Sequence, residues 1–191
     1  MNKGTRDLKY FMHYIKHTHY VTLAWKAICT ELWDRGMLNE EEFKKITNLI
    51  IWHDQSKMDK DEWEAYAEKF YGDKKTSEVK AAFEIAKNSH KSKNLHHFES
   101  LKDYEGNDWK CYIVELVCDY IAMGWEFDNY ILEYYESEKE NIELPKEYKE
   151  YLESILNILR EKELFETIES HLDEKKEAEL DFLNITLGQK K

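Results

Sequence analysis

Apolar residues return every three or four positions along most of this chain, which is the spacing of an amphipathic helix. After Asn39, for example, Phe43, Ile46 and Ile50 fall on one helix face. No stretch shows the strict alternation of a half-buried strand. The pattern predicts helices over residues 5–33, 40–54, 59–71, 77–90 and 108–124, a shorter one after Asp128, and one after Pro145 that Phe165, Ile168 and Leu172 continue. The predicted fold class is all-α, with residues 91–97 as a polar loop.

Two of the predicted helices begin with a capping signal. Asn39 precedes Glu42 by three residues, and Asp59 precedes Glu62 by the same distance. In a capping box the first side chain accepts a backbone N–H of the new helix, and the glutamate reaches back to the cap. Beyond this signal, Glu62 and Tyr66 are expected to make helix-surface and packing contacts rather than to touch a substrate.

The composition is that of a folded, mostly helical protein. Of 191 residues, 42% are apolar and 14% aromatic, with one Pro and six Gly. This length supports one substantial core. We predict a helical domain over residues 1–140 and acidic amphipathic helices over residues 141–191, which pack on that domain or on a partner. Their Glu-rich face is most simply a solvated surface, and a homodimer through them is the alternative.

Charge and hydropathy narrow the class of partner. A net charge of −12 disfavours binding to duplex nucleic acid, which needs clustered Lys and Arg. It still allows a nucleotide as substrate, because a bound cation reverses the local field.

No apolar run approaches the ~20 residues that span a bilayer, and the N-terminus lacks an apolar signal region. Cys29, Cys111 and Cys118 form no CxxC pair and are expected to be buried thiols. We therefore expect a cytoplasmic protein.

The sequence pair His53-Asp54 ends an apolar run, where a buried charge is costly unless it is paired or ligated. Histidine and aspartate also recur on either side of this pair. The ordered series comprises His17, His53, Asp54, His90, His96, His97 and Asp119. Imidazole and carboxylate are common metal ligands, and this set suffices for one or two divalent cations.

Each histidine of this series also has a plainer interpretation. His17 stands close to His13 and His19, and any one of the three taken alone is more often a surface or hydrogen-bonded side chain. His96 and His97 together are compatible with a polar loop. Asp119 is harder to explain without a cation, because it and Glu115 lie one turn apart on an apolar helix. Two buried carboxylates without a cationic partner would be destabilising.

These residues resemble the signature of the HD-domain metal-dependent phosphohydrolase superfamily, His…His-Asp…Asp on a helical bundle. The chain looks closest to a bacterial and phage family catalogued only as a domain of unknown function. The similarity spans roughly residues 10–135 and leaves out the acidic C-terminal helices. The matching segments are residues 17–21, 53–57, Glu62 to Tyr66 with Phe70, His90 with residues 94–97, and residues 115–124.

The resemblance implies an HD-domain-like helical bundle that binds one or two divalent ions (Mn, Fe, Co, Ni, Zn or Mg). Asp54 would bridge two metals, and Lys57 would face substrate phosphate or pair with a site carboxylate. Glu115 would orient a histidine or a water in the catalytic centre. The implied first metal has His17, His53, Asp54 and Asp119 as ligands, and the second has Asp54, His90 and His96 or His97.

The implied activity is hydrolysis of a nucleotide or another small phosphoester by metal-activated water. Ser56 stands where the cyclic-dinucleotide enzymes of the superfamily carry glycine, and their Gly-Tyr-Pro extension is absent, which argues against that substrate. Two alternatives stay open: a catalytically silent module that binds nucleotide and metal, and a di-iron oxygenase on the same scaffold.

Overall fold

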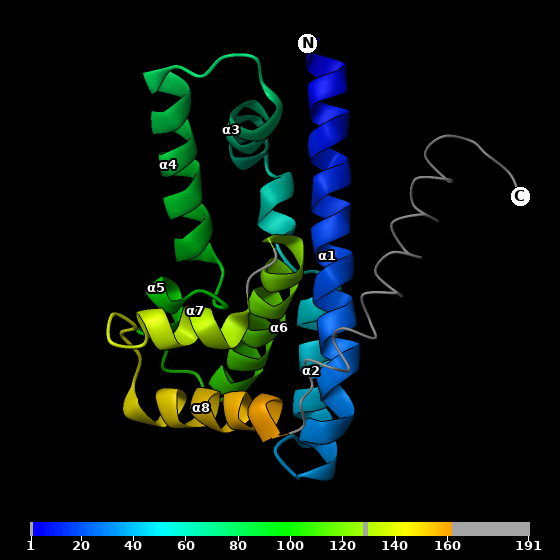
Figure 1. Cartoon of the computed structure of the whole chain (residues 1–191), viewed down its shortest axis with the longest axis vertical. Coiled ribbons are helices and arrows are strands. Elements are labelled where there is room, and N and C mark those ends of the chain that lie inside the picture. Colours follow the sequence, from blue (N-terminus) through cyan, green and yellow to red (C-terminus); the bar gives the residue numbers. More distant parts are fainter. Residues whose placement is uncertain (1, 128–129, 162–191) are drawn as a thin grey trace, which may run out of the picture. The chain divides into compact units, whose positions relative to one another are not determined.

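The computed structural model describes residues 2–127 and 130–161, and these are helical without a strand, which confirms the all-α fold class (Figure 1). The elements are α1 (Lys3–Asp34), α2 (Glu40–Ile51), the 3₁₀ turn η1 (Gln55–Met58), α3 (Lys60–Tyr71), α4 (Ser77–Lys93), α5 (Phe98–Leu101), α6 (Trp109–Phe127), α7 (Ile131–Glu138) and α8 (Lys146–Glu161).

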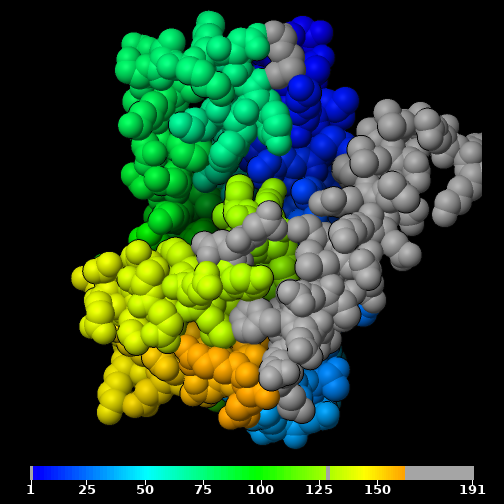
Figure 2. All heavy atoms as spheres, in the orientation of Figure 1, coloured from blue at the N-terminus to red at the C-terminus, as the bar shows by residue number. Residues whose placement is uncertain are grey.

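Helix α6 is the centre of the core. It is apolar over most of its surface, and residues such as Ile113, Leu116 and Val117 are completely buried. Apolar helix faces must be covered by neighbouring elements, and α1 and α2 pack against α6. The 32-residue α1 continues past α6 to contact α3, which in turn packs on α4. Side chains fill the space that separates the ribbons of α3 and α4 (Figures 1 and 2).

The two predicted capping boxes have different outcomes. At Asn39 the box is complete, because its side chain accepts the N–H of Glu42, whose carboxylate accepts the N–H of Asn39. At Asp59 the helix begins as predicted, but the Asp59 side chain makes no capping hydrogen bond. Glu62 is instead buried inside the molecule, where its carboxylate meets other polar side chains. The expectation of a surface role for Glu62 is therefore wrong.

Several helix boundaries differ from the predicted ones. Helix α4 runs to Lys93, three residues beyond His90, and α6 runs to Phe127 without stopping at Gly124. The short elements η1 and α5 were not predicted. Helix α2 ends at Ile51, so His53-Asp54 lies in the turn that follows it rather than within the helix. Asp54 has a positive φ of 60°, a left-handed conformation that aspartate tolerates better than most residues.

The first compact unit of the chain ends at Leu152, and residues from Glu153 onward belong to a second. The predicted boundary at residues 140 and 141 stays a prediction. The proposed continuation of the last helix through Phe165, Ile168 and Leu172 lies outside the described residues. Within the described part, no helix is both long and apolar enough to cross a membrane.

The three cysteines are free thiols, as predicted. Cys111 and Cys118 are buried on α6, whereas Cys29 on α1 is only partly buried.

Because α6 forms the centre of the core, removing apolar volume from it should be far more destabilising than the same change on a surface helix. We expect Ile113→Ala to lower the free energy of unfolding by about 2–5 kcal/mol. The matched control is Ile85→Ala on α4, whose side chain is 72% exposed and which should change stability by less than about 0.5 kcal/mol. Urea denaturation of both variants measures the difference. Equal losses would contradict the central place of α6.

Candidate metal centre

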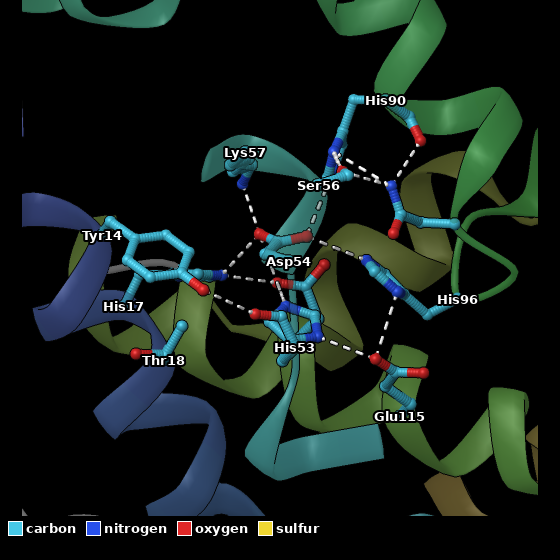
Figure 3. A network of polar contacts seen from close by, with 12 residues as sticks. Tyr14, His17, Thr18, His53, Asp54, Ser56, Lys57, His90, His96 and Glu115 are labelled. Atoms are coloured by element: carbon cyan, nitrogen blue, oxygen red, sulfur yellow. Dashed lines mark hydrogen bonds and ion pairs between the residues drawn. The ribbon is translucent and has the colours of Figure 1, made fainter. Parts of the chain in front are cut away.

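The predicted ligand residues come from different parts of the chain and meet at one place. Figure 3 labels five of them, His17, His53, Asp54, His90 and His96. Their sources are α1 for His17, the turn after α2 for His53 and Asp54, α4 for His90, the α4–α5 connection for His96 and His97, and α6 for Asp119. All are buried except His97, which is half-buried. The other two histidines of α1 do not join them: His19 is exposed, and His13 lies 2.9 Å from the hydroxyl of Tyr71.

Asp54 lies at the centre of this cluster, with its two oxygens facing different histidines (Figure 3). Its Oδ2 is 3.6 Å from His17 Nε2 and 3.5 Å from His53 Nε2. Its Oδ1 is 2.9 Å from His90 Nε2 and 3.3 Å from His96 Nε2. A carboxylate placed in this way can contribute one oxygen to each of two cations.

Two donor sets next to Asp54 follow from these positions, and potential ligand atoms of His53, His96 and Glu115 form a third group at the outer side of the histidines. In the first set, Asp119 Oδ1 lies 3.1 Å from His17 Nε2 and 3.6 Å from His53 Nε2. The second set adds His97 to the histidines around Asp54 Oδ1. Within each set, the potential ligand atoms lie no more than 4.8 Å apart. We call His17, His53 and Asp119 the first donor set, and Asp54, His90, His96 and His97 the second donor set.

Among the described residues, the atoms at the centre of the cluster have no hydrogen-bond partner. They are Asp54 Oδ1 and the Nε2 atoms of His17, His53, His90, His96 and His97. Buried polar atoms are normally hydrogen-bonded, and here carboxylate oxygens lie close to several of them without the alignment of a hydrogen bond. Atoms that are close together but not aligned for a hydrogen bond can instead bind the same cation between them. The donor chemistry and the unpaired atoms both fit divalent cations.

The outer ring nitrogens of the same histidines contact buried carboxylates. Glu115 Oε1 is 3.0 Å from His53 Nδ1 and 3.3 Å from His96 Nδ1. Glu62 Oε2 is 3.1 Å from His90 Nδ1. A carboxylate at this nitrogen orients a metal-binding histidine and makes its other nitrogen a better ligand. The sequence indicated this position for Glu115 but not for Glu62.

Glu126 is a further carboxylate of this kind that the sequence analysis did not identify. Its Oε2 is 3.5 Å from His17 Nδ1, an ion-pair distance without a hydrogen bond, and its Oε1 is 3.6 Å from His13 Nε2. Glu126 follows Asp119 by seven residues, which is two helix turns, so the two side chains share a face of α6. This seven-residue spacing is the sequence signal by which Glu126 could have been identified.

Opposite charges set the protonation of the metal-free cluster. Burial alone would lower the pKa of His17 and His53, but their carboxylate neighbours raise the pKa of each to about 9. Burial works against the charged form of Asp54 and Asp119 too, yet the lysine and histidines around them hold each pKa well below its usual range. For His97, burial lowers the pKa to about 2, so this imidazole is neutral.

Lys57 pairs with the central aspartate. It lies on η1, three residues after Asp54, and its Nζ contacts Asp54 Oδ2. It also lines a cavity of about 330 Å³ that reaches both donor sets through His17, His90 and Asp119. Of the two roles predicted for Lys57, the metal-free protein has the pairing with a site carboxylate.

The chain belongs to the family of unknown function DUF5662, whose model matches residues 6–171. This match extends well beyond residues 10–135, over which the motifs noted in the sequence are distributed. No curated protein and no solved structure matches the chain.

The raised pKa values predict that metal binding releases protons. With a pKa of about 9 instead of the ordinary 6.5, His17 and His53 are charged at neutral pH in the metal-free protein. The stability that their ion pairs provide is complete below about pH 6.5 and is lost as the pH rises through about 9. A metal binds neutral imidazole, so we expect proton release on adding Mn²⁺ at pH 7 and tighter binding at pH 8.

Calorimetric titration in two buffers with different ionisation enthalpies measures the protons released. The variant His17→Ala should release fewer protons than the unaltered protein. Binding without any proton release would contradict the assigned charges.

Proposed function

We propose that this protein is a metal-dependent phosphohydrolase that acts on a nucleotide or another small phosphoester. One observation carries the proposal: the single carboxylate of Asp54 directs one oxygen toward each of two donor sets whose inner nitrogens lack hydrogen bonds. Two cations held by a shared aspartate form an arrangement common among enzymes that cleave phosphoesters.

The resemblance to the HD-domain superfamily supports the same function. The signature order His…His-Asp…Asp corresponds here to His17, His53-Asp54 and Asp119, whose donor atoms lie together on a helical scaffold. His90, His96 and His97 correspond to the extra histidines of the two-metal members. Because a shared fold does not establish an activity, the proposal depends on the site and not on the scaffold.

The donor sets favour transition metals. Histidine nitrogens outnumber carboxylates, and imidazole suits Fe, Ni and Zn, whereas Mg prefers carboxylate, carbonyl and water oxygens. A bound ion of this kind would lower the pKa of a water and neutralise charge on a phosphoryl group. The contribution of the chain is to hold the ions through both donor sets, to orient the histidines through Glu62, Glu115 and Glu126, and to keep the site buried.

The cavity beside the donor sets has the lining expected for a phosphorylated ligand. Lys57, Lys87 and Lys91 line it and could face a phosphate, although each also pairs with a carboxylate, namely Asp54, Glu84 and Glu99. The acidic side chains Glu99, Asp119 and Glu126 line it as well. Its walls are largely aromatic, with Tyr14, Tyr66, Phe70, Phe83, Phe98, Tyr120, Phe127 and Tyr134 among the lining residues. A volume of about 330 Å³ suits a small molecule. We therefore expect a small phosphorylated substrate and no duplex nucleic acid as partner.

Loss of the central pair should remove both metal and activity. We expect His53→Ala and Asp54→Asn to lose bound metal and to lower phosphoester hydrolysis on the order of a thousandfold, because the ions supply several kcal/mol of charge stabilisation. His19→Ala is the matched control, since His19 is an exposed histidine on α1. Elemental analysis of protein purified without chelator, followed by a nucleotide and phosphoester panel with Mn²⁺, Fe²⁺, Co²⁺ and Ni²⁺, tests the proposal.

The same panel separates the alternatives. Bound metal and nucleotide without turnover under any ion would identify a catalytically silent binding module. Bound iron with an O₂-dependent product would identify an oxygenase. Absence of metal, with unaltered behaviour of His53→Ala and Asp54→Asn, would overturn the metal centre itself.

Lys57 should contribute to substrate binding as well as to the charge of the site. We expect Lys57→Ala to lower kcat/KM for a phosphoester roughly tenfold to a hundredfold, the range of a lost hydrogen bond between charged groups. Lys44→Ala is the control, because its side chain is 70% exposed and forms an ion pair with Glu40, one turn earlier on α2. Steady-state kinetics on both variants provides the comparison. Unchanged kinetics for Lys57→Ala would leave Lys57 with a structural role alone.

A further inference from the structure

We propose that Glu115 is a positioning residue shared by the two donor sets, so that a cation bound in one set strengthens binding in the other. This inference rests on the metal centre of the proposed function. It goes further because it assigns a link between the two sites to a residue outside both sets.

The link is a single carboxylate oxygen. Glu115 Oε1 is 3.0 Å from Nδ1 of His53, a member of the first donor set, and 3.3 Å from Nδ1 of His96, a member of the second (Figure 3). The two imidazole rings lie side by side, with centroids 4.4 Å apart. One atom of Glu115 therefore touches one candidate ligand from each set.

The surroundings of Glu115 explain why it stays in this position. Glu115 projects from the apolar helix α6 and is only 4% exposed. An ionised carboxylate buried in this way needs partners that offset its desolvation. In the described part of the chain, Glu115 forms its ion pairs with these two histidines, His53 and His96.

Metal binding at Nε2 requires a neutral imidazole with its proton on Nδ1. In His53 and His96 that Nδ1–H then donates to the same oxygen of Glu115. Fixing one ring holds Glu115, and Glu115 in turn holds the other ring in the orientation that suits a cation. A cation bound in either set thus orders the histidine ring of the other set before the second cation binds. This coupling acts equally in both directions.

The other outer carboxylates each serve one set and provide matched controls. Glu62 contacts His90 of the second donor set, and Glu126 contacts His17 of the first. Substitution by glutamine keeps the shape of each side chain and removes its charge. The three variants therefore differ in which donor sets they touch.

The experiment is calorimetric titration of the metal-free, full-length protein with Mn²⁺, with site occupancies taken from anomalous diffraction of crystals at limiting Mn²⁺. We expect Glu115→Gln to weaken binding at both sites by roughly tenfold to a hundredfold, as loss of an outer carboxylate typically does. Glu62→Gln should weaken only the second site and Glu126→Gln only the first. Thermal unfolding of the metal-free variants controls for the fold.

A second readout reports the hydrogen bonds themselves. In Zn²⁺-loaded protein the Nδ1–H protons of His53 and His96 should give downfield NMR signals that shift together in Glu115→Gln and stay unchanged in Glu62→Gln and Glu126→Gln. If Glu115→Gln does not fold, Glu115→Asp, which keeps the charge but shortens the side chain, should weaken both sites.

Two bound ions with only one site weakened by the Glu115 variants would overturn the shared role, as would two unaffected sites. Metal binding without phosphoester hydrolysis would sink the proposed activity and leave this inference intact. Failure of the unaltered protein to bind metal would overturn both.

Discussion

The burial of the Asp54 carboxylate is the constraint on which the centre of this structure depends. Asp54 is 3% exposed, and an isolated carboxylate at such a position would be strongly destabilising. Lys57 and four histidines surround it. They come from α1, the turn after α2, η1, α4 and the α4–α5 connection. Stabilising this one buried carboxylate therefore requires helices that are far apart in the sequence to converge.

Helix α6 supplies the complementary half of the arrangement. It is the most deeply buried helix in the described part of the chain, yet it carries Glu115, Asp119 and Glu126 on the side that faces the histidines. Apolar side chains on its other faces pack against α1 and α2. One helix thus holds the core together and brings three carboxylates to the candidate metal centre, which explains how so polar a cluster is accommodated within a helical core.

The outer carboxylates distinguish the cluster from a chance gathering of histidines, since they leave the Nε2 atoms of His17, His53, His90 and His96 free to face inward. A set of surface or loop histidines would not need partners of this kind. The aromatic cavity, which Lys57, Lys87 and Lys91 also line, lies directly beside the candidate centre and has the volume of a small-molecule site.

The sequence alone was enough to predict the all-α fold class, most helix positions and the candidate ligands. Those features depend on local periodicity and on residue chemistry, because Asp119 in an apolar helix and His53-Asp54 after an apolar run are unusual wherever they occur. Only the tertiary structure decided the division into two donor sets, the inward position of Glu62 and the role of Glu126. These depend on which side chains from separate helices meet, and helical spacing within one segment does not specify the distance to another. Glu62 shows the difference most clearly: its local signal was that of a helix cap, but contact with His90 and Ser56 places it inside the molecule instead.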